Sequence, residues 1–194
     1  MTVPKITLYN AHYCPYAARA VLALAETNQE HDVVELDLSV PRPDWYLKDI
    51  NPSGQVPALK LGEGHIILES LIVAEYIADL HPESGLIPKD PLQLAQSRYL
   101  IHHWGAHTQS ALFKATITLD AAESAKARQE VFTELERRQE GVEQEFEQAL
   151  KDNKNLQRFR EWRDAISQRP TVQKASAPRE IVIKNYRKFL PKSN

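Results

Sequence analysis

The sequence predicts an α/β N-terminal domain followed by an all-α C-terminal domain. As far as about residue 85, short β-rich runs alternate with helix-forming runs, and the pattern changes every few residues. Beyond that point the apolar residues recur at helical spacing almost throughout. Pro88 and Pro91 lie between the two patterns and mark a linker. We therefore expect one domain at residues 1–82, a linker at 83–91 and a helical domain at 92–194.

The N-terminal elements follow the order βαβ, a connecting segment, then ββα. Pro15 stands at the first turn of the first helix, where its missing N–H costs nothing. A Gly62-Glu63-Gly64 turn joins the last two strands as a hairpin, and Ser70 can cap the helix that follows. A βαβ unit implies a parallel pair of strands, so we expect a small mixed sheet with helices on its faces. The expected strands are 6–9, 34–39, 56–61 and 65–68, and the expected helices are 17–26, 45–49 and 70–80.

The C-terminal part is expected to be helical almost throughout. The longest amphipathic run is highly charged, and we interpret its charges as a solvated helix face. Arg169-Pro170 is expected to stop the third helix. The expected helices are 92–119, 123–150, 156–166 and 181–190.

Composition excludes several classes of function. There are 24 basic and 26 acidic residues, a formal net charge of −2, so no basic excess indicates nucleic-acid binding. No run approaches the ~20 apolar residues of a membrane span, and the first residues lack the apolar region of a signal peptide. The six glycines form neither a P-loop nor a complete dinucleotide-binding motif. The single cysteine suits a reducing compartment, so we expect a cytoplasmic protein that binds neither nucleic acid nor membrane.

That cysteine, Cys14, lies where a strand has ended and a helix begins. The N–H groups and the dipole at the start of a helix favour an anion, and thiols placed there ionise more readily than free thiols. The alternative is an inert buried thiol, the usual fate of free cysteine. Ala17 occupies the place of the second cysteine in a C-x-x-C pair, so an external thiol must resolve any mixed disulfide.

Two further pairs of residues can contact a ligand. Val56-Pro57 stands at a strand start, where a trans bond is the default. A cis bond there would turn the backbone N–H and C=O of Val56 toward a ligand, which could pair with them as an added strand does. At the start of the helix after the hairpin, Ser70 could donate to a carboxylate and Glu69 could accept from an ammonium group. The alternative interpretation of this second pair is a simple helix cap.

Three segments together resemble the cytosolic glutathione transferases: residues 13–19 around Cys14-Pro15, residues 51–59 around Val56-Pro57, and residues 68–70. A cysteine in place of serine or tyrosine is similar to the omega class and its fungal and bacterial relatives. The resemblance covers the first 85 residues closely and the rest more loosely. It implies a thioredoxin-like N-terminal domain before the all-α domain, glutathione as co-substrate, and a homodimer.

The resemblance also implies roles for matching residues. Cys14 matches the catalytic cysteine that forms a mixed disulfide with glutathione. Val56 matches the residue whose backbone pairs with the cysteinyl part of glutathione, before a cis-proline that matches Pro57. Glu69 and Ser70 match the pair that holds the γ-glutamyl end.

Three more residues complete the expected glutathione site. Arg42 is placed where omega enzymes have a basic residue facing the glycyl carboxylate. Lys48 competes for that role, and the choice between them stays open. Tyr16 resembles an aromatic residue beside the thiol.

His103 and His107 lie four residues apart on an expected helix, which is the spacing of a metal-binding pair. No acidic residue stands between them as in the H-E-x-x-H motif, and we expect no metal. Together with Trp104 they are expected to line the pocket of the second substrate or to pack between the domains.

The helical half departs from the family pattern. The polar break at 151–155 runs straight into residues 156–162, which resemble a later helix of the family. The central helix of the helical domain is therefore expected to be missing. Either the protein is a shortened variant of the family, or the sequence omits residues of this domain.

The function implied by the resemblance is thiol transfer with Cys14 as nucleophile. The expected reactions are reduction of mixed disulfides or dehydroascorbate and removal of glutathione from conjugates. The second substrate would be a small electrophile or a disulfide. One alternative is a conjugating transferase or isomerase, and another is a non-catalytic ligand-binding relative.

Overall fold

The computed structural model describes residues 5–62, 64–109, 120, 122–123, 125–127, 129–130, 164–176, 178 and 180–181. These residues divide into two compact units. The first takes in the described residues of Met1–Lys89 and Ser167–Asn185. The second takes in those of Asp90–Ile166 and Tyr186–Asn194.

The first unit is built on a four-stranded mixed sheet. Its strands β1 (Ile6–Asn10), β2 (Asp32–Glu35), β3 (Ala58–Leu61) and β4 (His65–Leu68) are arranged in the order β2-β1-β3-β4. β1 is parallel to β2 and antiparallel to β3, and β3 is antiparallel to β4. Helix α1 (Ala17–Glu26) connects the parallel pair. The predicted order, and with it the thioredoxin-like fold, is confirmed.

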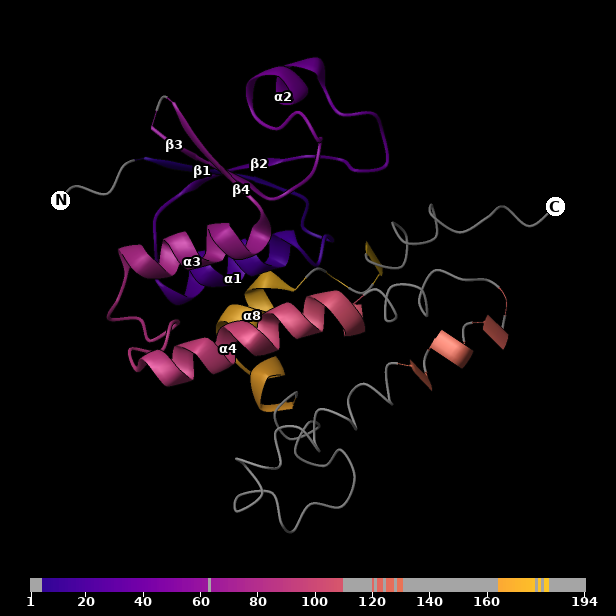
Figure 1. The fold of residues 1–194 in the computed structure, drawn as a ribbon. Helices are drawn as coiled ribbons and strands as arrows, with labels where there is room; N and C mark the ends of the chain where they lie inside the picture. Colours follow the sequence, from indigo (N-terminus) through magenta and orange to yellow (C-terminus); the bar gives the residue numbers. More distant parts are fainter. Residues whose placement is uncertain are drawn as a thin grey trace, which may run out of the picture. The chain divides into compact units, whose positions relative to one another are not determined.

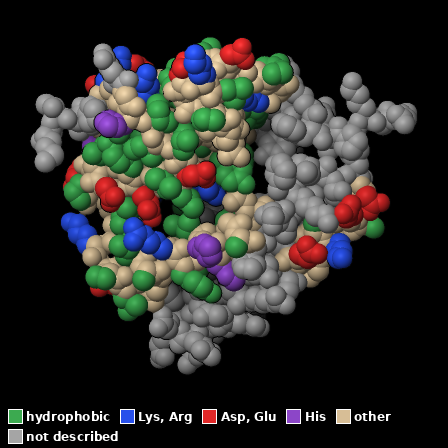
Figure 2. Space-filling view, turned by 45° about the horizontal axis from the view of Figure 1, so that its top comes forward, with side chains coloured by type: hydrophobic (Ala, Val, Ile, Leu, Met, Phe, Trp, Pro, Cys, Tyr) green, Lys and Arg blue, Asp and Glu red, His purple; other side chains and the backbone are tan. Residues whose placement is uncertain are grey.

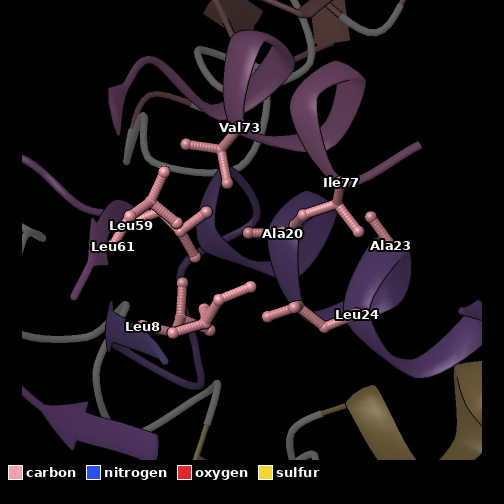
Figure 3. Packing of buried hydrophobic residues seen from close by; sticks show 9 residues of the cluster. Leu8, Ala20, Ala23, Leu24, Leu59, Leu61, Val73 and Ile77 are labelled. Atoms are coloured by element: carbon pink, nitrogen blue, oxygen red, sulfur yellow. The ribbon is translucent and has the colours of Figure 1, made fainter. Parts of the chain in front are cut away.

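Helices cover both faces of this sheet. α1 and α3 (Ser70–Leu80) lie side by side on one face, and α2 (Asp44–Asp49) lies across the other (Figure 1). Between the sheet and the helix pair, short alanine side chains of α1 allow branched side chains of α3 to approach closely (Figure 3). Burying each large aliphatic side chain here contributes about 1.5–3 kcal/mol. The buried residues of this core are Ile6, Leu8, Ala20, Ala23, Leu24, Leu59, Leu61, Val73 and Ile77.

The core under α2 is centred on a fully buried phenol, Tyr46. Its ring contacts the ring of Tyr9, with centroids 5.6 Å apart, and the ring of Trp45 at 5.7 Å. Its hydroxyl donates a 2.7 Å hydrogen bond to the backbone oxygen of Gln55. Burial raises the pKa of Tyr46 from its ordinary value of 10.0 to about 12, because the phenolate would lose its hydration.

The second strand was predicted at 34–39, but it begins at residue 32 and ends at residue 35, so both predicted ends were wrong. β2 lies at Asp32–Glu35, followed by one more ladder bond from Leu36 N to Asn10 O, 2.8 Å long. Beyond it the chain leaves the sheet, and the backbone N–H of Leu38 donates to the hydroxyl of Tyr13 at 2.7 Å. The alternation of apolar residues continues in this loop because Leu36 is buried and Leu38 half-buried. Alternation alone therefore extended the predicted strand too far.

In the second unit, α4 (Pro91–His103) is followed by a π-helical turn, η1 (Trp104–Thr108). The carboxylate of Asp90 accepts a 2.8 Å hydrogen bond from Gln93 N, and Pro91 takes the first helical position. The helix predicted at 92–119 is thus confirmed over its first turns. Residues 110–119, most of 123–150 and 156–166, and most of 181–190 lie outside the described residues.

A short helix that the sequence did not predict belongs to the first unit. α8 (Pro170–Ala175) begins at the proline that was expected only to stop a helix. It contacts α1, and the carboxylate of Glu26 accepts hydrogen bonds from Arg169 and Thr171. Proline cannot continue a preceding helix, but it suits the first position of a new one, so Pro170 both ends the helix before it and begins α8.

Charged side chains of both signs are interspersed on the face drawn in Figure 2, as the net charge of −2 leads one to expect. Among the described residues, no helix is long and apolar enough to cross a membrane.

The raised pKa of Tyr46 predicts a loss of stability in alkali. The neutral phenol is favoured in the folded protein, so its contribution is complete below pH 10.0 and is lost as the pH rises toward about 12. The free energy of unfolding should fall by roughly 2–3 kcal/mol across that window. We expect urea titrations at several pH values to show this fall in the wild type and a smaller one in Tyr46→Phe. Parallel curves for the two proteins would contradict the prediction.

Candidate functional site

The first unit contains a cleft of about 420 Å³ beside the only thiol. Four segments meet around it: the turn before α1, the loop before α2, the loop before β3 and the start of α3. Of the eight residues predicted to contact glutathione, seven line the cleft. The exception is Lys48, which is exposed and lies outside the lining. The lining residues are Cys14, Tyr16, Leu38, Arg42, Asn51, Gly54, Gln55, Val56, Pro57, Glu69 and Ser70.

Cys14 stands in a turn that the backbone holds firmly. Its N–H donates to Ala11 O at 2.8 Å, and its carbonyl accepts from Ala18 N at 3.0 Å, as in a first helical turn. The side chain is half-buried, so it can both be reached from the cleft and be shielded from bulk water. Tyr16, at the N-cap of α1, is 44% exposed at the edge of the same cleft.

The peptide bond between Val56 and Pro57 is cis, as the resemblance to the glutathione transferases implies, although trans is the default for such a bond taken alone. The loop before it is fixed by Asn51, whose Nδ2 donates to Gln55 O at 2.9 Å. The Oδ1 atom of the same side chain accepts from both the N–H and the hydroxyl of Ser53. Because Asn51 is buried, these bonds satisfy polar atoms that would otherwise be costly. The loop that carries the buried segment Val56-Pro57 into the cleft is therefore held by hydrogen bonds from the side chain of Asn51.

Glu69 and Ser70 form the wall at the start of α3. The prediction that Ser70 caps this helix was wrong: Glu69 takes the N-cap position, and Ser70 is the first helical residue. Glu69 has φ 68° and ψ 118°, a conformation that costs a residue with a side chain about 1–3 kcal/mol. Strain of this kind is concentrated at functional sites. The carboxylate of Glu69 is exposed, whereas Ser70 is only 7% exposed.

Behind Ser70 stands Arg19, a residue to which the sequence analysis gave no role. Its Nη1 donates to the Oγ atom of Ser70 at 2.9 Å, and its guanidinium lies 5.2 Å from the centre of the Tyr16 ring. The sequence did contain a sign that Arg19 has a specific role, because Arg19 is the only charged residue of α1 before Glu26. A charge placed on an alanine-rich, largely buried helix needs a partner.

Arg42 supports the opposite wall. Its guanidinium donates to the backbone oxygens of Asp37 and, at 2.8 Å, Leu38, where the chain has left β2. Its side chain packs on Gly54, which has φ 69°. A Cβ atom at that glycine would lie 2.9 Å from Cγ of Arg42 and 3.2 Å from Cδ2 of Leu47. Asn51, Gly54 and Gln55 also line the cleft and belong to the segment 51–59, but no role was predicted for them.

The residues predicted for the second substrate belong to the second unit. His103 ends α4, and its ring centroid is 5.6 Å from that of Tyr99; Trp104 begins η1. The side chain of His107 lies outside the described part of the chain. The second-substrate pocket therefore stays a prediction.

A larger hollow of about 1070 Å³ lies between α1, the start of β2 and α8. It is lined by none of the predicted site residues and holds no thiol. This hollow is larger than the cleft beside Cys14, but only the cleft brings a thiol together with the predicted site residues. We therefore take the smaller cleft as the candidate site.

Gly54→Ala should destabilise the protein more than the same change at another glycine of similar backbone conformation. Gly85, with φ 73° and open space around it, is the matched control. The left-handed backbone costs both variants about 1–2 kcal/mol, and the clash with Arg42 and Leu47 adds about 1–3 kcal/mol at Gly54 only. Urea unfolding measures the difference. Equal losses in the two variants would show that the close approach is not important.

Comparison with known proteins places this geometry in context. Residues 8–85 match the family model described as glutathione S-transferase, N-terminal domain. The chain is 34% identical over 94 residues to glutathione S-transferase omega-1 of Mus musculus, covering 48% of this chain and 38% of the relative. It is 36% identical over 130 residues to a probable glutathione transferase omega-2 of Caenorhabditis briggsae, covering 66% of this chain and 49% of the relative. The aligned part thus spans less than half the length of these relatives.

The fold has a counterpart among solved structures. The crystal structure of glutathione transferase Omega 1C from Trametes versicolor superposes with a TM-score of 0.74 at 25% identity, covering 98% of this chain and 100% of that one. Residues 8–85 thus match the N-terminal domain of the glutathione S-transferases, and the chain is similar to glutathione transferases of the omega class.

Proposed function

We propose that this protein is a glutathione-dependent thiol transferase in which Cys14 is the nucleophile. One observation carries the proposal: the only thiol of the chain shares a cleft with a buried Val56-Pro57 segment and with Glu69-Ser70. The similarity to omega-class glutathione transferases supports the same conclusion. On the same grounds we propose a homodimer in the cytoplasm.

Each part of glutathione has a partner in the proposed complex. The carboxylate of Glu69 accepts from the ammonium group of the γ-glutamyl end, and Ser70 donates to its carboxylate. The backbone of Val56 pairs with the cysteinyl unit. These contacts would bring the glutathione sulfur to Cys14.

For the glycyl carboxylate we propose Arg42, because it lines the cleft and Lys48 does not. A guanidinium carries five N–H donors, and the carbonyls of Asp37 and Leu38 use two of them. The remaining donors of Arg42 suit a carboxylate, which is a charge-assisted acceptor.

The reaction runs through a mixed disulfide. The thiolate of Cys14 attacks the glutathione sulfur of a disulfide R–S–S–G; the new bond joins Cys14 to glutathione, and R–S⁻ leaves. A second glutathione thiolate then attacks the bound glutathione sulfur, releasing oxidised glutathione and restoring the Cys14 thiolate. Ala17 offers no second thiol, so the external glutathione is required.

Two other acceptors fit the same cycle. Dehydroascorbate takes up two electrons and two protons while two glutathione molecules become oxidised glutathione. A thioether conjugate G–S–R gives its glutathione sulfur to Cys14, and the carbon of R takes a proton.

Incubation with oxidised glutathione should add one glutathionyl group to the wild-type chain, visible in an intact-mass spectrum and reversed by excess glutathione. Cys14→Ser should lower glutathione-dependent reduction of 2-hydroxyethyl disulfide to the uncatalysed rate, because a hydroxyl forms no disulfide. Full activity in Cys14→Ser, or no adduct on the wild type, would contradict the proposal. A conjugating enzyme would instead turn over an aryl halide, and a ligand-binding protein would show neither activity.

Glu69→Ala should weaken glutathione binding by about 10- to 150-fold, the equivalent of a lost charged hydrogen bond worth about 1.5–3 kcal/mol. Glu69→Gln keeps an acceptor oxygen and should lose less. Both variants retain a Cβ atom, so the backbone strain at this position is unchanged. Isothermal titration with S-methylglutathione measures the dissociation constant, with Glu83→Ala, an exposed glutamate outside the cleft, as control. An unchanged constant in Glu69→Ala would place the γ-glutamyl end elsewhere.

A further inference from the structure

The hydrogen bond between Arg19 and Ser70 has a direction. A guanidinium has donors and no acceptor, so the Oγ atom of Ser70 must present a lone pair to Arg19. The hydroxyl proton of Ser70 is therefore turned away from Arg19. That hydroxyl makes no other hydrogen bond to the residues that the structure describes, although Ser70 is only 7% exposed. A buried donor that lacks an acceptor and lines a cleft is available to a ligand.

Arg19 is itself held in place by α1. Its backbone N–H donates to Tyr16 O at 3.2 Å, and its guanidinium lies over the Tyr16 ring, a cation–π contact. Ser70, in contrast, belongs to α3. Arg19 does not line the cleft, whereas Tyr16 and Ser70 both do. The arginine thus acts from behind Ser70, across the junction of the two helices.

From this arrangement we infer that Arg19 is a positioning residue that makes Ser70 a dedicated donor for a ligand carboxylate. The inference rests on the proposed binding of glutathione in this cleft. The hydrogen bond from Arg19 turns the hydroxyl proton of Ser70 toward the ligand. Donation by a charged group also polarises the O–H bond of Ser70 and makes it a stronger donor. The positive charge behind Ser70 also favours an anion over a cation at this point.

The neighbouring Glu69 has the opposite preference. Its exposed carboxylate favours a cation, while Ser70 backed by Arg19 favours an anion. Two adjacent residues would thus distinguish the two charges of an α-amino acid terminus. The two charges can be tested separately, because each can be removed from the ligand.

The experiment uses three S-methyl tripeptides, which cannot form a disulfide with Cys14. S-Methylglutathione carries both charges of the γ-glutamyl end. The 4-aminobutanoyl analogue lacks the α-carboxylate, and the glutaryl analogue lacks the ammonium group. Isothermal titration gives the dissociation constant of each tripeptide with the wild type, Arg19→Met, Arg19→Lys and Ser70→Ala.

Arg19→Met keeps the length of the side chain and removes its donors. It should weaken S-methylglutathione and the glutaryl analogue about tenfold or more and leave the 4-aminobutanoyl analogue unchanged. Ser70→Ala should show the same selectivity. The double variant should lose no more than Ser70→Ala alone, because Arg19 acts through Ser70. Arg19→Lys should recover part of the affinity, since an ammonium group also only donates.

A purely structural role for Arg19 would weaken all three tripeptides alike, and this outcome would overturn the inference. Losses that add in the double variant would overturn it as well. If Arg19→Met does not fold, as judged by circular dichroism, Arg19→Gln replaces it in the same comparison. Failure of the wild type to bind S-methylglutathione would overturn the proposed function and this inference together. Binding by the wild type with unselective losses would overturn this inference only.

Discussion

The shared direction of two strands is the constraint on which the site depends. β1 and β4 are each antiparallel to β3, so they run the same way and end at the same edge of the sheet. The helices that follow them, α1 and α3, consequently begin side by side on one face. Alanines at positions 20 and 23 keep the two helices close. Cys14 at one helix start and Ser70 at the other therefore reach the same cleft, although 56 positions separate them in sequence.

The opposite wall of the cleft is supported by buried polar atoms. Gln55 O receives two hydrogen bonds, from Tyr46 and Asn51, and each donor is itself buried. Arg42 ties the loop after β2 to Gly54, with no room for a side chain there. Internal hydrogen bonds thus hold this wall in place, while Glu69 stores strain on the facing side. Such a site is organised before a ligand arrives, which lowers the cost of binding.

Local patterns in the sequence predicted a large part of this arrangement. The order of strands and helices, the hairpin and the junction that carries Cys14 follow from periodicity and from proline placement. The end of β2 does not, because Leu36 and Leu38 alternate in a loop as they would in a strand. Local patterns also placed the cap of α3 at Ser70 instead of Glu69, and the cis bond at Val56-Pro57 was implied only by the resemblance to the glutathione transferases. Arg19 was visible as an unusual charge, but its partner lies 51 positions away on another helix.

The first unit is discontinuous, and this has a consequence for how the chain is made. Glu26, at the end of α1, forms hydrogen bonds with Arg169 and Thr171, which are synthesised more than a hundred residues later. At a synthesis rate of roughly 5–20 residues per second, the sheet and helices α1, α2 and α3 exist for several seconds without α8. During that interval the outer face of α1 is open to other proteins in the cell. A nascent chain of this protein is therefore exposed to chaperones and proteases at a place that the finished molecule covers.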